Sequence, residues 1–403
     1  MTTDLVEVPV GRGLLGCVVD PLGKPLDGKG PIASTVKYPV ERPAAASVRR
    51  RPNGEPVQTG IMAIDAMVPI ARGQRELIIG DRSTGKTSIC IDTIINQARL
   101  NRAAEASGDN DYRPLFSIYV AIGQKPATIA QVIGVLRQAG ALPYTVVVAS
   151  TSSDPASAQY LAPFAGAAMA EWFIDNGMDT LIVYDDLSRH AAACRQEDVF
   201  HLHRRLLERT ATATSLPIVE TQTGDAPGYV PTNLFSITDG QIFLETQLFH
   251  QGVRPAIPVG ISVSRLGSAA QMKAMRQVAG QLRTDFVQVR EIAASAKLGS
   301  PLDTAAQARI DRGKRLMELF KQRPHEPMPV EEQVAAIWAV QNGYMDDVPV
   351  DRVKAFQGEW TGHLATGRAE ILQQIVRQKA IDPELAADLK LSADRFKATV
   401  WRS

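Results

Sequence analysis

The segment that most constrains the fold is Gly80-Asp81-Arg82-Ser83-Thr84-Gly85-Lys86-Thr87, which matches the pattern GxxxxGK[ST]. It follows a short apolar run at Glu76–Ile79 and precedes a helical period formed by Ile91, Ile94, Ile95 and Ala98. A loop of this pattern needs a strand before it and a helix after it, because its backbone N–H groups surround phosphate oxygens at a helix N-terminus. The sequence therefore predicts a P-loop, a phosphate-binding loop between a strand and a helix.

The residue types of this loop suit a nucleotide that is bound together with Mg²⁺. The glycines let the backbone wrap closely around the phosphates, and Lys86 reaches the β- and γ-phosphates. Thr87 supplies a hydroxyl oxygen to the metal ion. We therefore expect the whole loop to contribute to nucleotide binding, through Gly80, Asp81, Arg82, Ser83, Thr84, Gly85, Lys86 and Thr87.

A second element of such a site follows about a hundred residues later. The apolar run Thr180–Tyr184 ends in two carboxylates, Asp185 and Asp186. In P-loop proteins a carboxylate at the end of a strand orients Mg²⁺, usually through water. We assign this role to Asp185 and expect Asp186 to be structural.

Short apolar runs alternate with helical stretches between residues 75 and 263. The runs expected to be strands are Glu76–Ile79, Phe116–Ile122, Tyr144–Ala149, Thr180–Tyr184, Leu216–Glu220 and Ile242–Leu244. This alternation is typical of a mostly parallel sheet flanked by helices. We expect an α/β domain of the P-loop NTPase class at residues 1–271, which begins with a short lead-in of strands and loops.

The remaining residues, 272–403, carry helical patterns. Val278, Leu282, Phe286 and Val289 follow a helical period, and the pair Asp382-Pro383 indicates the start of a helix. Leu385, Leu389 and Phe396 then continue an apolar stripe. We expect an all-α C-terminal domain that contains no catalytic cluster.

Composition and charge exclude several classes of protein. Lys plus Arg number 44 and Asp plus Glu 43, so the net charge of +1 argues against nucleic-acid binding through overall basicity. Three scattered cysteines indicate neither a disulfide framework nor a zinc site, and a reducing cytoplasm fits them. The sequence has neither a signal peptide nor an apolar run of about 18 residues, so any membrane association is expected through a partner. His201 and His203 do not share a helix face, and we interpret them as core or solvated residues.

Several stretches resemble the α subunits of F-type ATP synthases, and together they cover nearly the whole chain. The first is Gly73 to Arg82, which leads into the P-loop, followed by Tyr119 to Lys125 and Tyr184 to Ser188. The others are Pro231 to Asn233, Ile237 to Gln241, Ser262 to Arg265, Gly267 to Gln271, Val330 to Gln333 and Asn342 to Tyr344.

This resemblance implies a RecA-like nucleotide-binding domain in a subunit of the hexameric α₃β₃ head of a rotary ATPase. The implied ligands are ATP or ADP with Mg²⁺, and the implied partners are the β and γ subunits and the rest of the F1F0 complex. Nucleic acid is not among them. The implied location is peripheral, on the cytoplasmic side of the cell inner membrane, where the chain is held only by its partner subunits.

The resemblance also implies that this chain binds nucleotide without hydrolysing it. Gln124 stands where the related β subunit carries a glutamate that polarises the attacking water. A neutral amide can orient water but cannot accept its proton. By resemblance, Arg265 is an arginine finger for the neighbouring β site, and Arg254, Pro255 and Gln322 line the adenine pocket.

The chain also departs from the pattern of the family. It begins after the N-terminal β-barrel domain of its relatives and lacks a helix and loop between Gln196 and Glu197, as well as a shorter segment between Arg209 and Leu216. Ser83 stands where a glutamine is usual, and Arg323-Pro324 replaces a stretch that carries a second adenine-pocket glutamine. Two alternatives therefore stay open: a degenerate paralogue that does not assemble, and a self-sufficient RecA-like ring ATPase.

Overall fold

A computed structural model describes residues 6–32, 34–42, 54–194, 199–221, 228–258, 260–297 and 303–401. At the centre of this part of the chain lies an eight-stranded sheet with the order β12-β11-β6-β10-β9-β7-β8-β2. Its strands are β2 (Val18–Val19), β6 (Glu76–Asp81), β7 (Leu115–Gln124), β8 (Thr145–Thr151), β9 (Asp179–Asp185), β10 (Thr214–Thr221), β11 (Gly240–Leu244) and β12 (Val263–Ser264). All neighbours pair in parallel except β11 and β12. The mostly parallel sheet and all six of its expected strands are confirmed.

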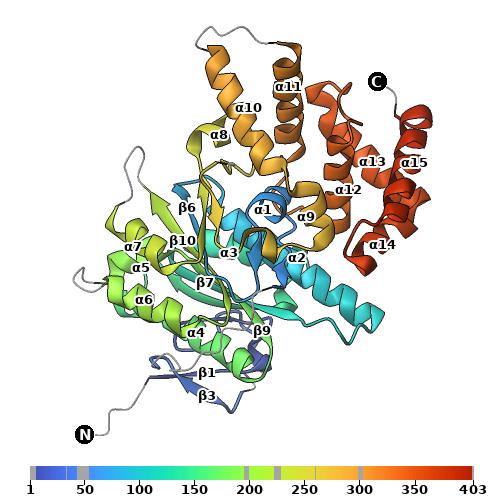
Figure 1. Cartoon of the computed structure of the whole chain (residues 1–403). Coiled ribbons are helices and arrows are strands. Elements are labelled where there is room, and N and C mark those ends of the chain that lie inside the picture. The colour runs from blue at the N-terminus through green and yellow to red at the C-terminus, as the bar shows by residue number, and fades with distance from the viewer. Residues whose placement is uncertain are drawn as a thin grey trace, which may run out of the picture.

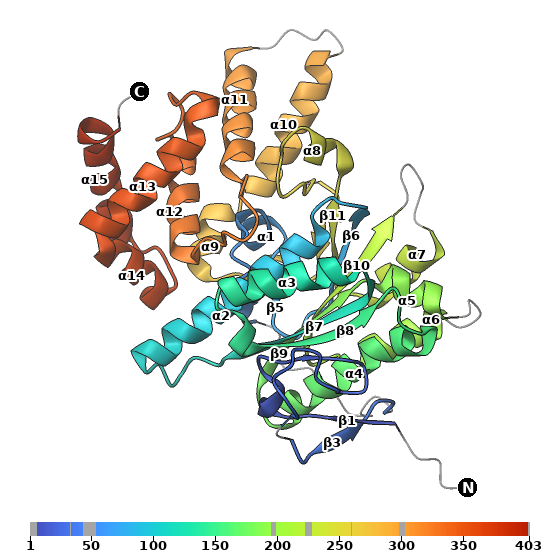
Figure 2. The ribbon, with the colours of Figure 1, turned by 180° about the vertical axis from the view of Figure 1, so that it is seen from behind.

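Helices cover both faces of this sheet (Figures 1 and 2). One face carries α1 (Met62–Met67), α2 (Lys86–Ser107) and α3 (Pro126–Gln138); the other carries α4 (Ala156–Asp175), α5 (Leu187–Ala193), α6 (Val199–Arg209) and α7 (Tyr229–Ile237). Successive residues of β7 divide between the two cores, with Ile118 on the α4 side and Tyr119 on the α2 side. Strands buried on both faces need apolar residues at every position, which explains the continuous runs in the sequence.

The N-terminal lead-in belongs partly to this sheet. Its β1 (Glu7–Pro9) pairs antiparallel with β3 (Lys37–Pro39), and both contact α4. Strand β2 joins the edge of the main sheet in parallel with β8, where Val18 faces Val147. A further pair, β4 (Pro56–Val57) with β5 (Ile70–Ala71), precedes the P-loop. The lead-in therefore supplies an edge strand in addition to the six strands expected from the sequence.

After β12 the described residues form helices only, as expected (Figure 1). They are α9 (Lys273–Ala279), α10 (Leu282–Lys297), α11 (Thr304–Leu319), α12 (Val330–Gln341), α13 (Val353–Gly367), α14 (Ala369–Gln378) and α15 (Pro383–Thr399). The period from Val278 to Val289 spans two helices, because α9 ends at Ala279. Helix α15 begins as predicted, with the carboxylate of Asp382 accepting the backbone N–H of Leu385 at 2.8 Å.

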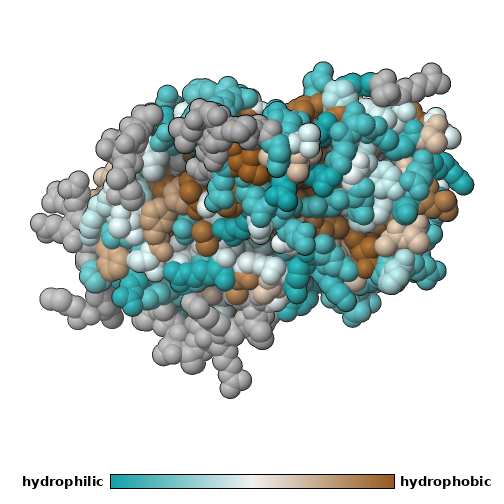
Figure 3. Space-filling view, turned by 45° about the horizontal axis from the view of Figure 1, so that its top comes forward, coloured by the Kyte–Doolittle hydropathy of each residue, from teal (hydrophilic) through white to brown (hydrophobic). Residues whose placement is uncertain are grey.

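The surface of the described chain has no dominant apolar face in the view of Figure 3, where hydrophobic residues gather in separate patches among hydrophilic ones. Among the described residues, no helix has both the length and the apolar content that crossing a bilayer requires. The three cysteines Cys17, Cys90 and Cys194 are free.

A histidine pair lies in the core between α5 and α6. His190 Nδ1 and His203 Nε2 are 3.1 Å apart, and both side chains are buried. Burial lowers the pKa of His190 to about 4 and that of His203 to about 3. His203 is therefore a core histidine, one of the two expected interpretations.

Candidate nucleotide-binding site

The P-loop joins β6 to α2, in the context that the motif predicts. Gly80 belongs to the end of β6, where a Cβ atom would lie 2.5 Å from the carbonyl oxygen of Leu244 on β11. Gly85 precedes the first residue of α2 with a φ of 97°, in the left-handed region that glycine adopts without strain. Two loop positions therefore require glycine, one for close packing and one for backbone conformation.

Lys86 lies at the start of α2 and is buried. Its Nζ donates to the backbone carbonyls of Gly80 at 2.9 Å and Asp81 at 2.5 Å, so the side chain lies back against its own loop. Burial lowers the pKa of Lys86, and the nearby carboxylates, including Glu220 and Asp185, oppose that shift. The ammonium group is therefore placed within the loop that it is expected to serve.

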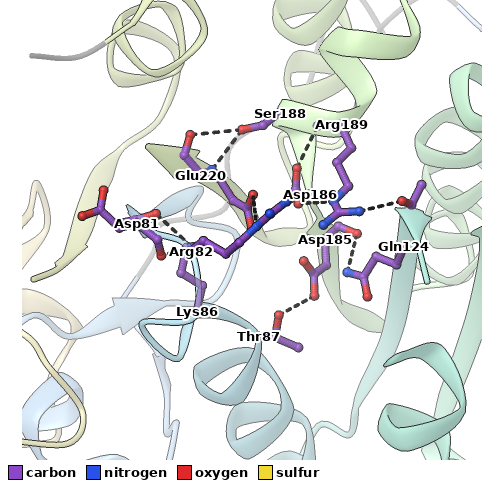
Figure 4. A network of polar contacts seen from close by, with 12 residues as sticks. Asp81, Arg82, Lys86, Thr87, Gln124, Asp185, Asp186, Ser188, Arg189 and Glu220 are labelled. Atoms are coloured by element: carbon purple, nitrogen blue, oxygen red, sulfur yellow. Dashed lines mark hydrogen bonds and ion pairs between the residues drawn. The ribbon is translucent and has the colours of Figure 1, made fainter. Parts of the chain in front are cut away.

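Thr87 and Asp185 lie together, although they come from different elements (Figure 4). Thr87 Oγ1 donates to Asp185 Oδ2 at 2.7 Å, and the hydroxyl of Tyr119 on β7 donates to the same oxygen at 2.7 Å. Asp185 is the last residue of β9 and is buried. Parallel strands end at one edge of the sheet, which brings the end of β9 to the start of α2.

The residues present fit a Mg²⁺ ion that is shared with phosphates. Mg²⁺ prefers oxygen ligands and is usually bound by one or two carboxylates together with substrate phosphates rather than by a full protein cage. Thr87 and Asp185 offer such oxygens. Gln124 adds a buried Oε1 with no hydrogen-bond partner in the described structure. No group of three or more His, Cys, Asp or Glu residues suited to a metal occurs within the described ranges.

Gln124 and Asp186 flank the Thr87–Asp185 pair. Gln124 ends β7, is buried, and its Nε2 donates to the backbone carbonyl of Asp185 at 2.9 Å. Asp186 caps α5, since its carboxylate accepts the backbone N–H of Arg189 at 2.8 Å. Arg189 also donates to the carbonyl of Gly123 at 2.7 Å, which ties α5 to the end of β7. Burial raises the pKa of Asp186 to about 6.

Two carboxylates beside the loop have distinct surroundings. Asp81 accepts hydroxyl hydrogens from Thr221 at 2.6 Å and Thr246 at 2.7 Å, and these bonds lower its pKa. Its side chain thus joins β6 to the end of β10 and the start of α8 (Thr246–His250). Glu220 lines the same cavity and lies 3.6 Å from Arg82, whose side chain is exposed. Sequence reasoning missed Glu220, which only the pairing of β10 with β6 brings to the loop.

A cavity of about 360 Å³ opens beside the P-loop, a size suited to a small-molecule ligand. Five of the eight P-loop residues line it, namely Ser83, Thr84, Gly85, Lys86 and Thr87, whereas Gly80, Asp81, Arg82 and Gln124 are not among the lining residues. Arg254, Pro255 and Gln322 line it as well, together with Phe249 and the replaced pair Arg323-Pro324. The residues assigned to phosphates and to a base by sequence therefore share one cavity.

Gln322 lines this cavity, but its amide is engaged elsewhere. Its Oε1 accepts the backbone N–H of Met62 at 2.7 Å, and its Nε2 donates to the carbonyl of Gly60 at 2.9 Å. Arg254 stacks over Phe249, with its guanidinium carbon 4.3 Å from the ring centroid. The cavity wall also includes Asp92, which sequence reasoning missed.

Arg265 lies apart from this cavity. It follows β12, is exposed, and its backbone N–H donates to the carbonyl of Asp239 at 3.0 Å. The missing helix and loop between Gln196 and Glu197 fall outside the described residues. At the second shortened point α6 ends at Arg209 and β10 starts at Thr214.

Two family descriptions match most of the chain. The nucleotide-binding domain of the ATP synthase alpha/beta family matches residues 60–264, and the C-terminal domain of the ATP synthase alpha/beta chain matches residues 271–396. ATP synthase subunit alpha of Aquifex aeolicus (strain VF5) is 51% identical over 420 residues, covering 98% of this chain and 81% of that relative. The alignment is longer than the 403 residues of this chain, so the relative has internal sequence without a counterpart here.

Proposed function

The chain belongs to the ATP synthase alpha/beta family, and on that premise we propose that it is an α-type subunit of a rotary ATP synthase. In this role it binds ATP or ADP with Mg²⁺ in the cavity beside the P-loop and does not hydrolyse it. It forms a ring with β subunits around γ, at the cytoplasmic side of the inner membrane, where other subunits hold it. The division into domains at residue 271 stays part of this proposal.

The observation that carries the proposal is the environment of Gln124. Its amide lies at the end of β7, hydrogen-bonded to the backbone of Asp185 and next to the Thr87–Asp185 pair. A general base must accept a proton from the attacking water, and an amide cannot do so. The site therefore offers groups that suit a Mg-nucleotide. At Gln124 it has an amide where the related β subunit carries a glutamate that polarises the attacking water.

The position of Arg265 supports a role for it in a neighbouring site. It follows the edge strand β12 and does not line this chain's own cavity. Two apolar neighbours are also exposed, Ile261 by 48% and Val263 by 37%. An exposed guanidinium among exposed apolar side chains at a sheet edge suits a subunit contact, in which the arginine would stabilise charge on a transferring phosphoryl group.

Two measurements on the purified full chain test the nucleotide role. Calorimetric titration with Mg-ATP is expected to show binding, and an assay of phosphate release is expected to show no hydrolysis above background. Lys86→Ala serves as the control, since it removes the ammonium group and should abolish binding. Rapid hydrolysis by the unaltered chain would instead support the self-sufficient ring ATPase.

Co-expression with a β subunit tests the assembly. The chain is expected to co-elute with β on size-exclusion chromatography, as a full-length α subunit does in a parallel experiment. If the full-length α subunit co-elutes and this chain does not, the degenerate paralogue that never joins a ring becomes the better account. Nucleotide binding alone would then remain as its activity.

A further inference from the structure

Asp92 lies in the wall of the cavity at some distance from the phosphate end. It is in α2, about 9 Å along the helix axis from Lys86 at roughly 1.5 Å per residue. Around it the cavity is lined by Ile61, Gln322 and Pro324, which come from segments before α1 and after α11. Asp92 is therefore placed where a base, rather than a phosphate, would lie.

Few side chains at this end of the cavity could distinguish one base from another. The amide of Gln322 is engaged on both sides by the backbone of Gly60 and Met62. Ile61 and Pro324 offer no polar side-chain atoms, and Arg254 stacks over Phe249. Hydrogen-bonding groups that are already satisfied by the backbone add little to discrimination between bases. Arg323 also lines the cavity but carries only donors, so the carboxylate of Asp92 is left as an acceptor at this end.

Only one of the two Asp92 oxygens has a partner. Oδ1 accepts the backbone N–H of His325 at 2.7 Å and lies 3.2 Å from His325 Nδ1. Oδ2 has no hydrogen-bond partner among the described residues, and the side chain is 10% exposed. The contact with His325 thus fixes the orientation of the carboxylate and leaves Oδ2 as a directed acceptor. A ligand group that donates to Oδ2 would therefore add a hydrogen bond to a charged acceptor.

We propose that Asp92 Oδ2 accepts a hydrogen bond from the 6-amino group of adenine and so gives the site its preference for adenine nucleotides. This inference rests on the proposed function, because it names the base of the nucleotide that this cavity binds. A purine that lacks the amino group offers no such donor to Oδ2. Burial raises the pKa of Asp92 to about 6, so the carboxylate is ionised at pH 8.

The test compares two nucleotides that differ only at position 6 of the base. Dissociation constants of Mg-ATP and of Mg-purine riboside 5′-triphosphate are measured by calorimetry at pH 8 on the full chain. The unaltered chain is expected to bind ATP roughly tenfold to a hundredfold more tightly, the usual effect of one hydrogen bond to a charged group. The ratio of the two dissociation constants is measured on the unaltered chain, so a folding defect in a variant cannot affect it.

Asp92→Asn then tests the residue itself. The side-chain oxygen of asparagine can still accept the N–H of His325, which leaves its NH₂ group, a donor, in the place of Oδ2. The ratio of the two dissociation constants is expected to fall to about one. Thr87→Val is the matched control, because it removes a group at the phosphate end, should weaken both nucleotides equally and should leave the ratio as it is.

The outcomes separate this inference from the function on which it rests. ATP binding without discrimination in the unaltered chain overturns the inference and leaves the proposed function standing. A ratio that Asp92→Asn does not change also overturns the inference, since discrimination then comes from another group. Failure of the unaltered chain to bind either nucleotide overturns both.

Discussion

Thr87 Oγ1 donates a hydrogen bond to Asp185 Oδ2 at 2.7 Å, which joins the first turn of α2 to the last residue of β9. The two residues are far apart in the chain, and only the parallel pairing of the sheet brings their elements to one edge. Tyr119 donates to the same oxygen, so the carboxylate is held from two sides. Neither of these two donors bonds to the other carboxylate oxygen, Asp185 Oδ1.

Replacing Thr87 by valine removes the hydroxyl and keeps the shape of the side chain. We expect the affinity for ATP in the presence of Mg²⁺ to fall about tenfold to a hundredfold, since the groups that orient a metal site contribute on that scale. Affinity in EDTA should change little, which titrations in the two buffers will measure. Thr87→Ser keeps the hydroxyl and is expected to bind as the unaltered chain does. An equal loss in both buffers would show that Thr87 does not act through the metal.

Arg265→Ala is expected to abolish turnover at β in an assembled complex, because arginine fingers contribute roughly 10³–10⁵ in rate. Nucleotide binding to this chain should stay near normal, since Arg265 does not line its cavity. Steady-state ATP hydrolysis and nucleotide binding to the isolated chain measure the two effects. Arg265→Lys keeps the charge but not the planar fork, so it should restore little activity. Lost binding at this chain's own site would refute the assignment.

The histidine pair predicts how stability depends on pH. His190 and His203 are buried with lowered pKa values of about 4 and about 3, while histidine in an unfolded chain titrates near 6.5. Between these values the unfolded state binds more protons, so the free energy of unfolding falls as the pH drops below about 6.5. Asp92 and Asp186, whose pKa values are raised to about 6, oppose this trend because the folded state protonates them first.

His203→Gln isolates the contribution of one histidine. The loss of unfolding free energy between pH 7 and pH 5 should be smaller in this variant by about 2 kcal/mol, since His203 no longer titrates. Urea denaturation at the two pH values gives both numbers. An identical pH dependence in the variant and the unaltered chain would mean that His203 is not held neutral by the fold.

A pair of glycines tests the packing of helices on the sheet. A Cβ at Gly166 in α4 would lie 2.4 Å from Val120 Cγ2 on β7, whereas a Cβ at Gly134 in α3 meets nothing within 4 Å. Gly166→Ala should therefore cost about 1–3 kcal/mol of stability. Gly134→Ala should gain about 0.5–1 kcal/mol, because alanine favours the helix. Urea midpoints measure both, and a neutral Gly166→Ala would show that α4 can move away from β7.

The strands of the sheet could be predicted because each is buried on both faces. Residues such as Ile118 and Tyr119 alternate between two cores, so the run reads as continuously apolar. The order of the strands could not be predicted, since β6 pairs with β10 and β11, whose residues are more than a hundred positions away. For the same reason Glu220 could not be placed at the P-loop.

The base end of the cavity was less predictable than the phosphate end. A phosphate site can be predicted from one local motif, because a loop and the start of a helix supply most of its hydrogen-bond donors. Gln322 is hydrogen-bonded to the backbone of Gly60 and Met62, and Asp92 to the backbone of His325. In each case the partners are far apart in the sequence. An aspartate within a helical period otherwise indicates a solvated face, so sequence offered no signal for Asp92.

The position of β6 between β10 and β11 has a consequence for biosynthesis. The strand that carries the P-loop is made early, but neither of its hydrogen-bonding neighbours exists until residues 214–244 have been translated. At about 5–20 residues per second, this delay lasts roughly 10–30 s. During that time the nascent chain exposes both edges of an apolar strand on the ribosome. We expect the nucleotide domain to depend on chaperone protection over this interval, and to complete its sheet only once β11 has emerged.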